Sequence, residues 1–161
     1  TVFMEPKALY NSVEASTVVP DDFEVPFGKA RIRREGTDLS IITYGNTTLF
    51  SLNVAERLAK ENGWNVEVID LRSLVPLDKD MIFESVKKTS KVLVVHEDKV
   101  FSGFGAEIAA MIGTEMFRYL DAPVQRVGST FTPVGFNPIL EKAVLPGEDR
   151  IYDAAKKLLE Y

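Results

Sequence analysis

The chain alternates between short apolar runs and longer stretches with a helical period. Four runs rich in β-branched residues have the composition of strands buried in a parallel sheet: residues 39–44, 66–71, 91–95 and 123–127. Between and after these runs, apolar residues recur at helical spacing, which predicts helices over residues 47–63, 76–88, about 105–120, 139–144 and 150–161. Thr47 or Thr48 is expected to cap the first helix and Gly63 to end it, while Pro76 and Asp78 open the second.

The first part of the chain has no sustained period. Residues 11–26 contain Ser, Thr, paired Asp and two Pro, a composition typical of a loop or linker. Residues 28–36 alternate weakly and are expected to form an edge strand with four cations on its open face. We interpret these cations as a solvated face rather than a binding patch. Residues 1–4 form an apolar run without an initiator Met, which favours a chain cut from a longer polypeptide over a processed terminus.

Strands that alternate with helices of this length predict βαβ units with right-handed crossovers. The expected fold class is α/β: a three-layer, doubly wound, mostly parallel sheet of the Rossmann-like kind. Ligands of such sheets bind beyond the carboxyl ends of the strands. A candidate site is therefore expected at residues 44–46, 70–73, 96–98 and 128–130.

Composition and charge exclude several classes of function. The 161 residues include 19 Lys and Arg against 24 Asp and Glu, a formal charge of −5 that argues against a nucleic-acid partner. The absence of Cys excludes thiol chemistry and sulfur-ligated metals, and the single His, His96, excludes a site of several histidines. No apolar run approaches the roughly 20 residues of a membrane-spanning helix, and no signal peptide opens the chain. The length suits one domain with at most a short appendage.

His96-Glu97-Asp98 follows the third predicted strand and offers an imidazole beside two carboxylates. Neighbouring residues on an extended chain point to opposite sides, so the three side chains need not converge. A lone His at a strand end is more often a structural or surface residue than a catalytic one. A position at the border of an active site is the alternative for His96. Ser102 lacks the Gly-x-Ser-x-Gly context of a nucleophile.

A glycine run lies between the third strand and the following helix, where a dinucleotide-binding loop would lie. Gly103 and Gly105 fit the start of that pattern, but Ile108 stands where a third Gly or Ala is needed. We therefore expect a flexible turn and a bare helix N-terminus, which would still attract an anion or a partner carboxylate. No catalytic, cofactor-binding or metal-binding residue is assigned on this basis.

Several segments together resemble one known family, in the family's own order. They are residues 2–10, 27–45, 66–78, 96–98, 102–108 and 121–127. The first is similar to the end of a pyrimidine-binding domain, and the others to the transketolase-type C-terminal domain of 2-oxoacid dehydrogenase beta subunits. The resemblance implies that residues 1–27 are the end of the preceding domain plus a linker, and residues 28–161 the C-terminal domain. The residues around His96 are closer to the 2-oxoisovalerate, branched-chain type than to the pyruvate type.

The resemblance implies a part of an enzyme that is inactive alone. The parent, a beta subunit or a fused alpha–beta chain, would be an oxidoreductase that decarboxylates a 2-oxoacid and transfers the acyl group to a lipoyl arm. Its thiamine diphosphate and magnesium would be held by domains whose motifs are not in this sequence. The expected partners are an alpha subunit or fused alpha domain, a second beta subunit, and the lipoyl acyltransferase core of a multienzyme complex. The expected location is the cytoplasm of a bacterium or the mitochondrial matrix of a eukaryote.

Pairing of two beta subunits would give four aromatic residues a role. Phe101, Phe104, Phe131 and Phe136 lie in two predicted loops, where they are interface candidates unless their rings turn into the domain's own core. Gly135 stands where many relatives carry Pro, so the contacts of this loop depart from the family pattern. Two other functions share the predicted fold. One is a flavodoxin-like module that binds a nucleotide or phosphate at Gly105, and the other is the C-terminal domain of a transketolase or deoxyxylulose-phosphate synthase.

Overall fold

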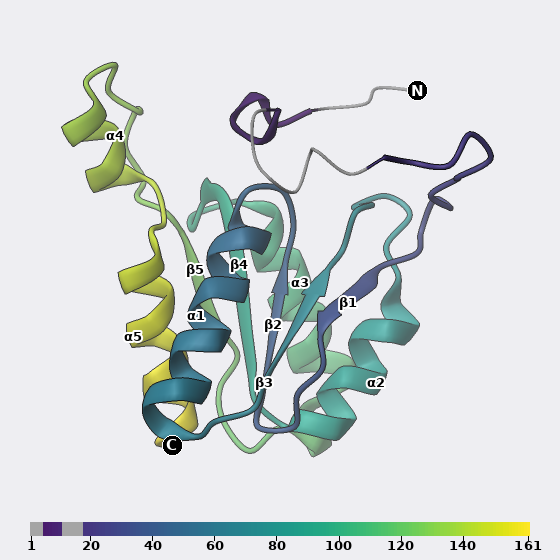
Figure 1. The fold of residues 1–161 in the computed structure, drawn as a ribbon. Coiled ribbons are helices and arrows are strands. Elements are labelled where there is room, and N and C mark those ends of the chain that lie inside the picture. Colours follow the sequence, from purple (N-terminus) through teal and green to yellow (C-terminus); the bar gives the residue numbers. More distant parts are fainter. Residues whose placement is uncertain (1–4, 11–17) are drawn as a thin grey trace.

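The structure, a computed structural model, describes residues 5–10 and 18–161 (Figure 1). Within these residues, one sheet contains β1 (Arg31–Arg34), β2 (Leu39–Thr43), β3 (Val66–Asp70), β4 (Val92–Lys99) and β5 (Gln125–Ser129). The α-helices are α1 (Thr47–Asn62), α2 (Lys79–Thr89), α3 (Phe104–Glu115), α4 (Pro138–Val144) and α5 (Glu148–Leu159). Two short 3-10 helices are η1 (Lys7–Leu9) and η3 (Phe117–Tyr119).

The strands lie in the order β1-β3-β2-β4-β5. β2 pairs in parallel with both β3 and β4, and β4 pairs in parallel with β5. β1 runs antiparallel to β3 and forms one edge of the sheet, as the weak alternation of residues 28–36 predicts. The predicted doubly wound, mostly parallel α/β fold is therefore confirmed. The strand order reverses between β2 and β4, which is the place where sheets of this kind bind ligands.

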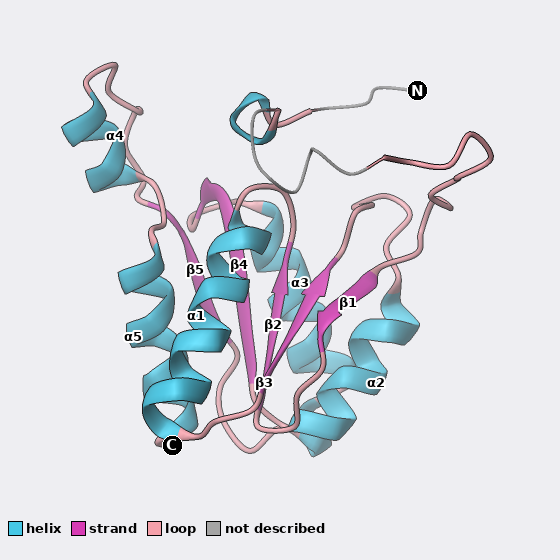
Figure 2. Cartoon of the chain, viewed as in Figure 1, coloured by secondary structure: helices cyan, strands magenta, loops and turns pink. Residues whose placement is uncertain are grey.

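Helices cover both faces of the sheet, so the molecule has three layers (Figure 2). Side chains of a strand point alternately to its two faces. In β4, Leu93 and Val95 pack with α1 and α5, whereas Val92 and Val94 pack with α2 and α3. All four side chains are fully buried. A strand buried on both faces reads as a continuous apolar run, which is why the central strands could be predicted.

The ends of α1 and α2 follow the sequence signals with one exception. Gly63 ends α1 in the left-handed conformation and Asp78 caps α2, both as predicted. The prediction of Thr47 or Thr48 as the cap of α1 is wrong, because both are already helical and Asn46 holds the capping position. The Thr47 hydroxyl instead donates to the carbonyl oxygen of Tyr44 at 2.8 Å, which fastens the start of α1 to the end of β2.

β4 is longer than its apolar run. The predicted end at residue 95 is wrong, because the strand continues to Lys99 through residues whose polarity is typical of a turn. Pairing with β5 explains the extension: Lys99 stands opposite Ser129, and the Val100 N–H donates to the Ser129 carbonyl at 3.0 Å. His96 therefore lies inside the strand and not at its end.

A buried polar network joins α2 to the sheet. The fully buried carboxylate of Glu67, in β3, accepts a hydrogen bond from the Ser85 hydroxyl at 2.5 Å. Since Ser85 gives its only hydroxyl hydrogen to Glu67, the Ser40 hydroxyl donates to Ser85, also at 2.5 Å. Lys88 of α2 binds the second oxygen of Glu67. Both groups that bind the Glu67 carboxylate, Ser85 and Lys88, thus come from α2. These contacts fix the position of α2 on the sheet.

Two parts of the chain lie apart from these layers. α4 stands beyond the end of β5, away from the helices that cover the sheet (Figure 1). Residues 18–30 contain no helix or strand, in agreement with the predicted linker, and the remaining linker residues 11–17 lie outside the described residues. The predicted apolar run at residues 1–4 also lies outside them.

Candidate functional site

His96 lies in the core at the point where the strand order reverses. It follows Val92 and Val94 in the alternation of β4, so its ring points to the side covered by α3. The side chain is 0% exposed. The fully buried ring suits the structural role that the sequence favoured for His96, and a position at the border of an active site stays a prediction.

Three glycines close over the His96 ring. A Cβ atom on Gly105 would lie 2.2 Å from Nε2, and one on Gly128 would lie 2.9 Å from Cε1. A Cβ atom on Gly103 would lie 3.1 Å from both Cε1 of His96 and Oδ2 of Asp98. These distances leave no room for a side chain, so the glycine residues allow α3 to pack closely against β4. A phosphate cradle would need this space to be empty.

The surroundings of His96 favour a neutral ring. Burial lowers the pKa of His96, and the positive charge of Arg126 acts in the same direction. The Asp98 carboxylate and backbone favour the protonated ring, but their effect is smaller than that of burial. Neither ring nitrogen makes a hydrogen bond of normal geometry with any part of the chain that the structure describes. Tyr44 stacks on the ring with centroids 6.2 Å apart.

The three residues His96, Glu97 and Asp98 do not form one catalytic group. Glu97 points away from His96 and accepts hydrogen bonds from the Asn46 side-chain amide at 3.2 and 3.3 Å. Asp98 is exposed and accepts from the Lys99 N–H at 2.7 Å. Burial, together with Asp98 and Glu97, raises the pKa of Tyr44 to about 12. The two charges that act on the Tyr44 hydroxyl are thus both negative, which disfavours a phosphate ligand beside it.

Three of the four aromatic interface candidates are exposed. Phe101 is 64% exposed and Phe131 74%, while Phe136 is fully exposed. Phe101 and Phe131 touch each other edge to face, with centroids 4.8 Å apart. Phe104 is partly buried against the core on the α2 and α3 side. Their role in an interface stays a prediction.

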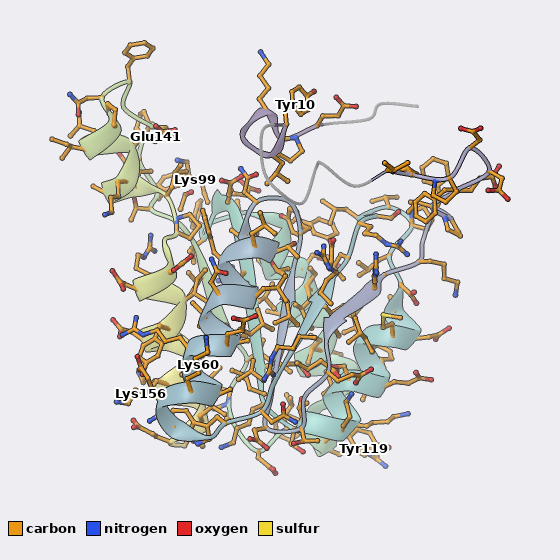
Figure 3. The ribbon with its side chains drawn as sticks, viewed as in Figure 1. Tyr10, Lys60, Lys99, Tyr119, Glu141 and Lys156 are labelled. Atoms are coloured by element: carbon orange, nitrogen blue, oxygen red, sulfur yellow. The ribbon has the colours of Figure 1, made fainter. Side chains whose placement is uncertain are left out.

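The exposed aromatic surface sits at one end of the molecule. Lys99, which donates to the carbonyl of Thr132 next to Phe131, and Glu141 of α4 lie at this end, whereas Tyr119 and Lys156 lie at the other (Figure 3). Ile139 and Leu140 of α4, which stands at this end of the molecule, are also exposed. The sequence could not predict this exposure because the amphipathic pattern of a helix does not tell whether its apolar face has a partner.

A shallow hollow of about 620 Å³ lies beside α3, and the sequence analysis did not single it out. It is lined by small residues that share one face of α3, Ala106, Ala109, Ala110 and Gly113, and also by Leu120 and Tyr161. The regular spacing of these small residues was the available signal.

Metal-binding and membrane-spanning features are not found in the described part of the chain. Among residues 5–10 and 18–161, no three His, Asp or Glu side chains are grouped so that they could hold a metal ion. Across the same residues, no helix has the length and apolar character needed to cross a membrane.

Comparison with known proteins gives one matching family and several similar beta subunits of dehydrogenases. A family model described as "Transketolase, C-terminal domain" matches residues 28–151. The pyruvate dehydrogenase E1 component subunit beta of Rickettsia felis is 42% identical over 161 residues, which cover 99% of this chain and 48% of that protein. The 3-methyl-2-oxobutanoate dehydrogenase subunit beta of Mycobacterium tuberculosis is 41% identical over 162 residues, which cover 98% of this chain and 44% of that protein. The chain thus spans about half the length of these relatives.

A solved structure has the same arrangement of strands and helices. It is a split-gene transketolase described as an inactive beta4 tetramer, which superposes with a TM-score of 0.76 at 27% sequence identity. The match covers 89% of this chain and 46% of that one. Sequence and structure comparisons therefore point to the same group of proteins.

Proposed function

Because this chain belongs to the transketolase C-terminal domain family, we propose that it serves as the C-terminal domain of a 2-oxoacid dehydrogenase beta subunit. The observation that carries the proposal is the alignment of nearly the whole chain with such beta subunits at 41 to 42% identity. The parent enzyme oxidatively decarboxylates a 2-oxoacid and transfers the acyl group to a lipoyl arm. This domain contributes to assembly and borders the active site, without supplying catalytic residues.

The cofactors of the parent enzyme, thiamine diphosphate and magnesium, belong to its other domains. The residues that the structure describes do not fit them. The glycine run that would have to cradle a diphosphate is filled by the His96 ring, and the described residues offer no metal-binding cluster. The same observation weighs against a free-standing nucleotide-binding module.

The domain is proposed to meet three partners: an alpha subunit or fused alpha domain, a second beta subunit, and the lipoyl acyltransferase core of a multienzyme complex. For pairing with a second copy, we propose the surface formed by Phe101, Phe131 and Phe136, hereafter the aromatic surface. These rings are exposed in this chain, and exposed apolar clusters of this kind mark interaction sites. The similar split-gene transketolase is described as a tetramer of beta chains, which supports self-association.

The substrate of the parent enzyme is proposed to be a branched-chain 2-oxoacid, and its place the bacterial cytoplasm or the mitochondrial matrix. The sequence around His96 supports the branched-chain type. Identity to the relatives does not separate the two types, since it is 42% to the pyruvate enzyme and 41% to the branched-chain enzyme. We expect the domains that hold the cofactor to determine which 2-oxoacid the parent enzyme accepts.

A domain exchange tests the proposal. Residues 28–161 replace the matching half of the Mycobacterium tuberculosis and Rickettsia felis beta subunits, and each chimera is combined with its own alpha subunit. We expect each chimera to assemble and keep at least about one tenth of the parental turnover, with the substrate choice of its host. The chain alone should show no heat of thiamine diphosphate binding in calorimetry. Failure of both chimeras to assemble, or a micromolar cofactor site on the chain alone, would contradict the proposal.

A further inference from the structure

Three guanidinium groups gather around one carboxylate at the carboxyl end of β3. Arg31 of β1 pairs with Asp70 of β3, and Nη1 of Arg33 lies 3.7 Å from Oδ2 of Asp70. The backbone N–H of Arg72 donates to Oδ1 of Asp70 at 3.2 Å. The positive charges of all three arginines act on Asp70. These four residues are hereafter the arginine cluster.

The members of the arginine cluster come from two separate segments of the chain. The sequence placed Arg31 and Arg33 on the solvated face of an edge strand and gave Asp70 and Arg72 only as the end of another strand. The antiparallel pairing of β1 with β3 brings these segments together. The interpretation as a solvated face therefore left out the guanidinium group and the carboxylate that β3 contributes.

Arg72 is held in place by its own backbone conformation and by hydrogen bonds. Its φ is 55°, in the left-handed region that residues with a side chain seldom occupy. Nε donates to the carbonyl oxygen of Lys29 at 3.0 Å, and Nη2 donates to that of Ala30 at 3.2 Å. Unusual backbone conformations of this kind are concentrated at functional sites. The turn after β3 thus fixes a guanidinium group beside the segment that enters β1.

The arginine cluster has unbalanced positive charge. Three guanidinium groups face a single carboxylate, so two positive charges lack a counter-charge within the cluster. Across residues 5–10 and 18–161, Arg33 forms an ion pair with Asp70, whereas Arg31 and Arg72 form no ion pair. Like charges that gather on one carboxylate repel each other, and a bound anion would relieve that repulsion.

The guanidinium groups are more accessible than the carboxylate. Arg31 and Arg72 are exposed, whereas the side chain of Asp70 is only 17% exposed. Burial raises the pKa of Asp70, and the Arg72 N–H and the three guanidinium groups lower it by less. An anion that arrives from solvent therefore meets the guanidinium groups before it meets the carboxylate.

The cluster lies where sheets of this kind bind their ligands. Asp70 ends β3 and pairs with Thr43, which ends β2, so the cluster stands at the carboxyl ends of parallel strands. Glu97 and Asp98 belong to β4, on the other side of β2. A strand thus separates the positive charge at the end of β3 from these two carboxylates.

We propose that the arginine cluster binds a phosphate group. A phosphate monoester has a charge of about −1.5 to −2 at pH 7, which matches the two unbalanced positive charges. Its oxygens accept the paired N–H groups of a guanidinium with good geometry. The site is independent of the function proposed above, because it rests on side chains of this chain alone.

A phosphate titration of the intact chain tests the site. Sodium phosphate is added at about pH 7.5 and constant ionic strength while NMR follows the backbone amides, and sodium acetate is the matched anion. We expect saturable shifts at residues 31–33 and 70–72 with a Kd of about 1 mM for phosphate, and at least about tenfold weaker binding of acetate. Shifts that do not saturate, or equal affinities for the two anions, would overturn the proposal.

Two substitutions with opposite expected effects distinguish the cluster from the overall charge of the chain. Arg31→Gln removes an exposed guanidinium group and should weaken phosphate binding at least about fivefold. Asp70→Asn removes the repelling carboxylate but keeps an acceptor for the Arg72 N–H, so phosphate should bind about threefold more tightly. Arg118→Gln, in the exposed η3, changes the net charge as Arg31→Gln does and should leave the Kd unchanged.

The amide signals away from the cluster show whether each variant keeps the fold. Equal losses of affinity in Arg31→Gln and Arg118→Gln, or weaker binding in a folded Asp70→Asn, would contradict a site at the arginine cluster. A Kd near 1 mM is about a thousandfold weaker than the micromolar cofactor site that would contradict the proposed function, so the two results are distinct.

A second phosphate compound identifies the source of the bound group. Glycerol phosphate is titrated under the same conditions as inorganic phosphate. Binding of the ester that is about tenfold tighter would assign the site to a phosphorylated small molecule, and equal or weaker binding would assign it to free phosphate. Saturable binding of neither compound would overturn the proposal.

Discussion

Gly105 is the residue on which the packing of α3 against β4 most directly depends. An added Cβ would lie 2.2 Å from Nε2 and 2.3 Å from Cδ2 of His96, a rigid ring in a filled core. Gly105→Ala must therefore displace α3 or the ring. We predict a loss of about 2–3 kcal/mol in the free energy of unfolding, measured by urea denaturation.

Gly113 provides a matched control in the same helix. Nothing lies within 4 Å of a Cβ atom placed there. Gly113→Ala should leave stability unchanged or raise it by up to about 1 kcal/mol, because alanine favours a helix. A similar loss for both substitutions would show that contact with His96 does not set the cost at Gly105.

The sequence identified His96 and the glycine run as candidates but gave them separate explanations. It treated the ring as a strand-end residue and the glycines as a flexible turn. Their contact joins β4, the start of α3 and Gly128 of β5. Periodicity along one segment carries no information about which backbone will close on a side chain from another segment.

Asp78 links two elements and should matter more than an ordinary helix cap. Its carboxylate accepts from the Met81 N–H of α2 at 3.4 Å and from the Ala30 N–H, just before β1, at 3.0 Å. Asp78→Ala leaves a buried backbone donor without a partner as well as an uncapped helix. We predict a loss of about 2–3 kcal/mol in stability, measured by thermal or urea unfolding.

Asn137 is the matched control for Asp78. It caps α4 by accepting from the Ile139 N–H at 2.9 Å, on an exposed helix away from the sheet. Asn137→Ala should cost no more than about 0.5 kcal/mol of global stability, because α4 can open without the core. If Asp78→Ala and Asn137→Ala lower the free energy of unfolding by the same amount, the second contact of Asp78 has no effect on stability and the interpretation is wrong.

Elements could be predicted where burial and local signals agree. The central strands, Gly63 and Asp78 are of this kind. The end of β4 could not, because His96 to Lys99 are polar and only pairing with β5 makes them a strand. Glu67 shows the same limit, since a carboxylate inside a strand becomes acceptable only through Ser85 and Lys88 of α2.

At the scale of the whole molecule, the sequence predicts layers more easily than order. Alternation of strands and helices indicates a doubly wound sheet, but nothing in the pattern states that β3 and β4 lie on opposite sides of β2. That order places His96 at the reversal and gathers Phe101 and Phe131 at one end of the sheet. The contact between Phe101 and Phe131 is thus a product of topology, because the two residues are far apart in the sequence.

The aromatic surface should be what holds two copies of this chain together. Phe136 is the variant of choice because its fully exposed ring has no packing of its own to lose. Phe136→Ser should weaken self-association about tenfold in sedimentation equilibrium, as expected when an aromatic contact of an interface is removed. Phe117→Ser is the control: its ring is 77% exposed but belongs to η3, next to Tyr119 at the opposite end of the molecule (Figure 3). If Phe117→Ser weakens association as much as Phe136→Ser, or if the unmodified chain stays monomeric at all concentrations tested, two copies do not pair through this surface.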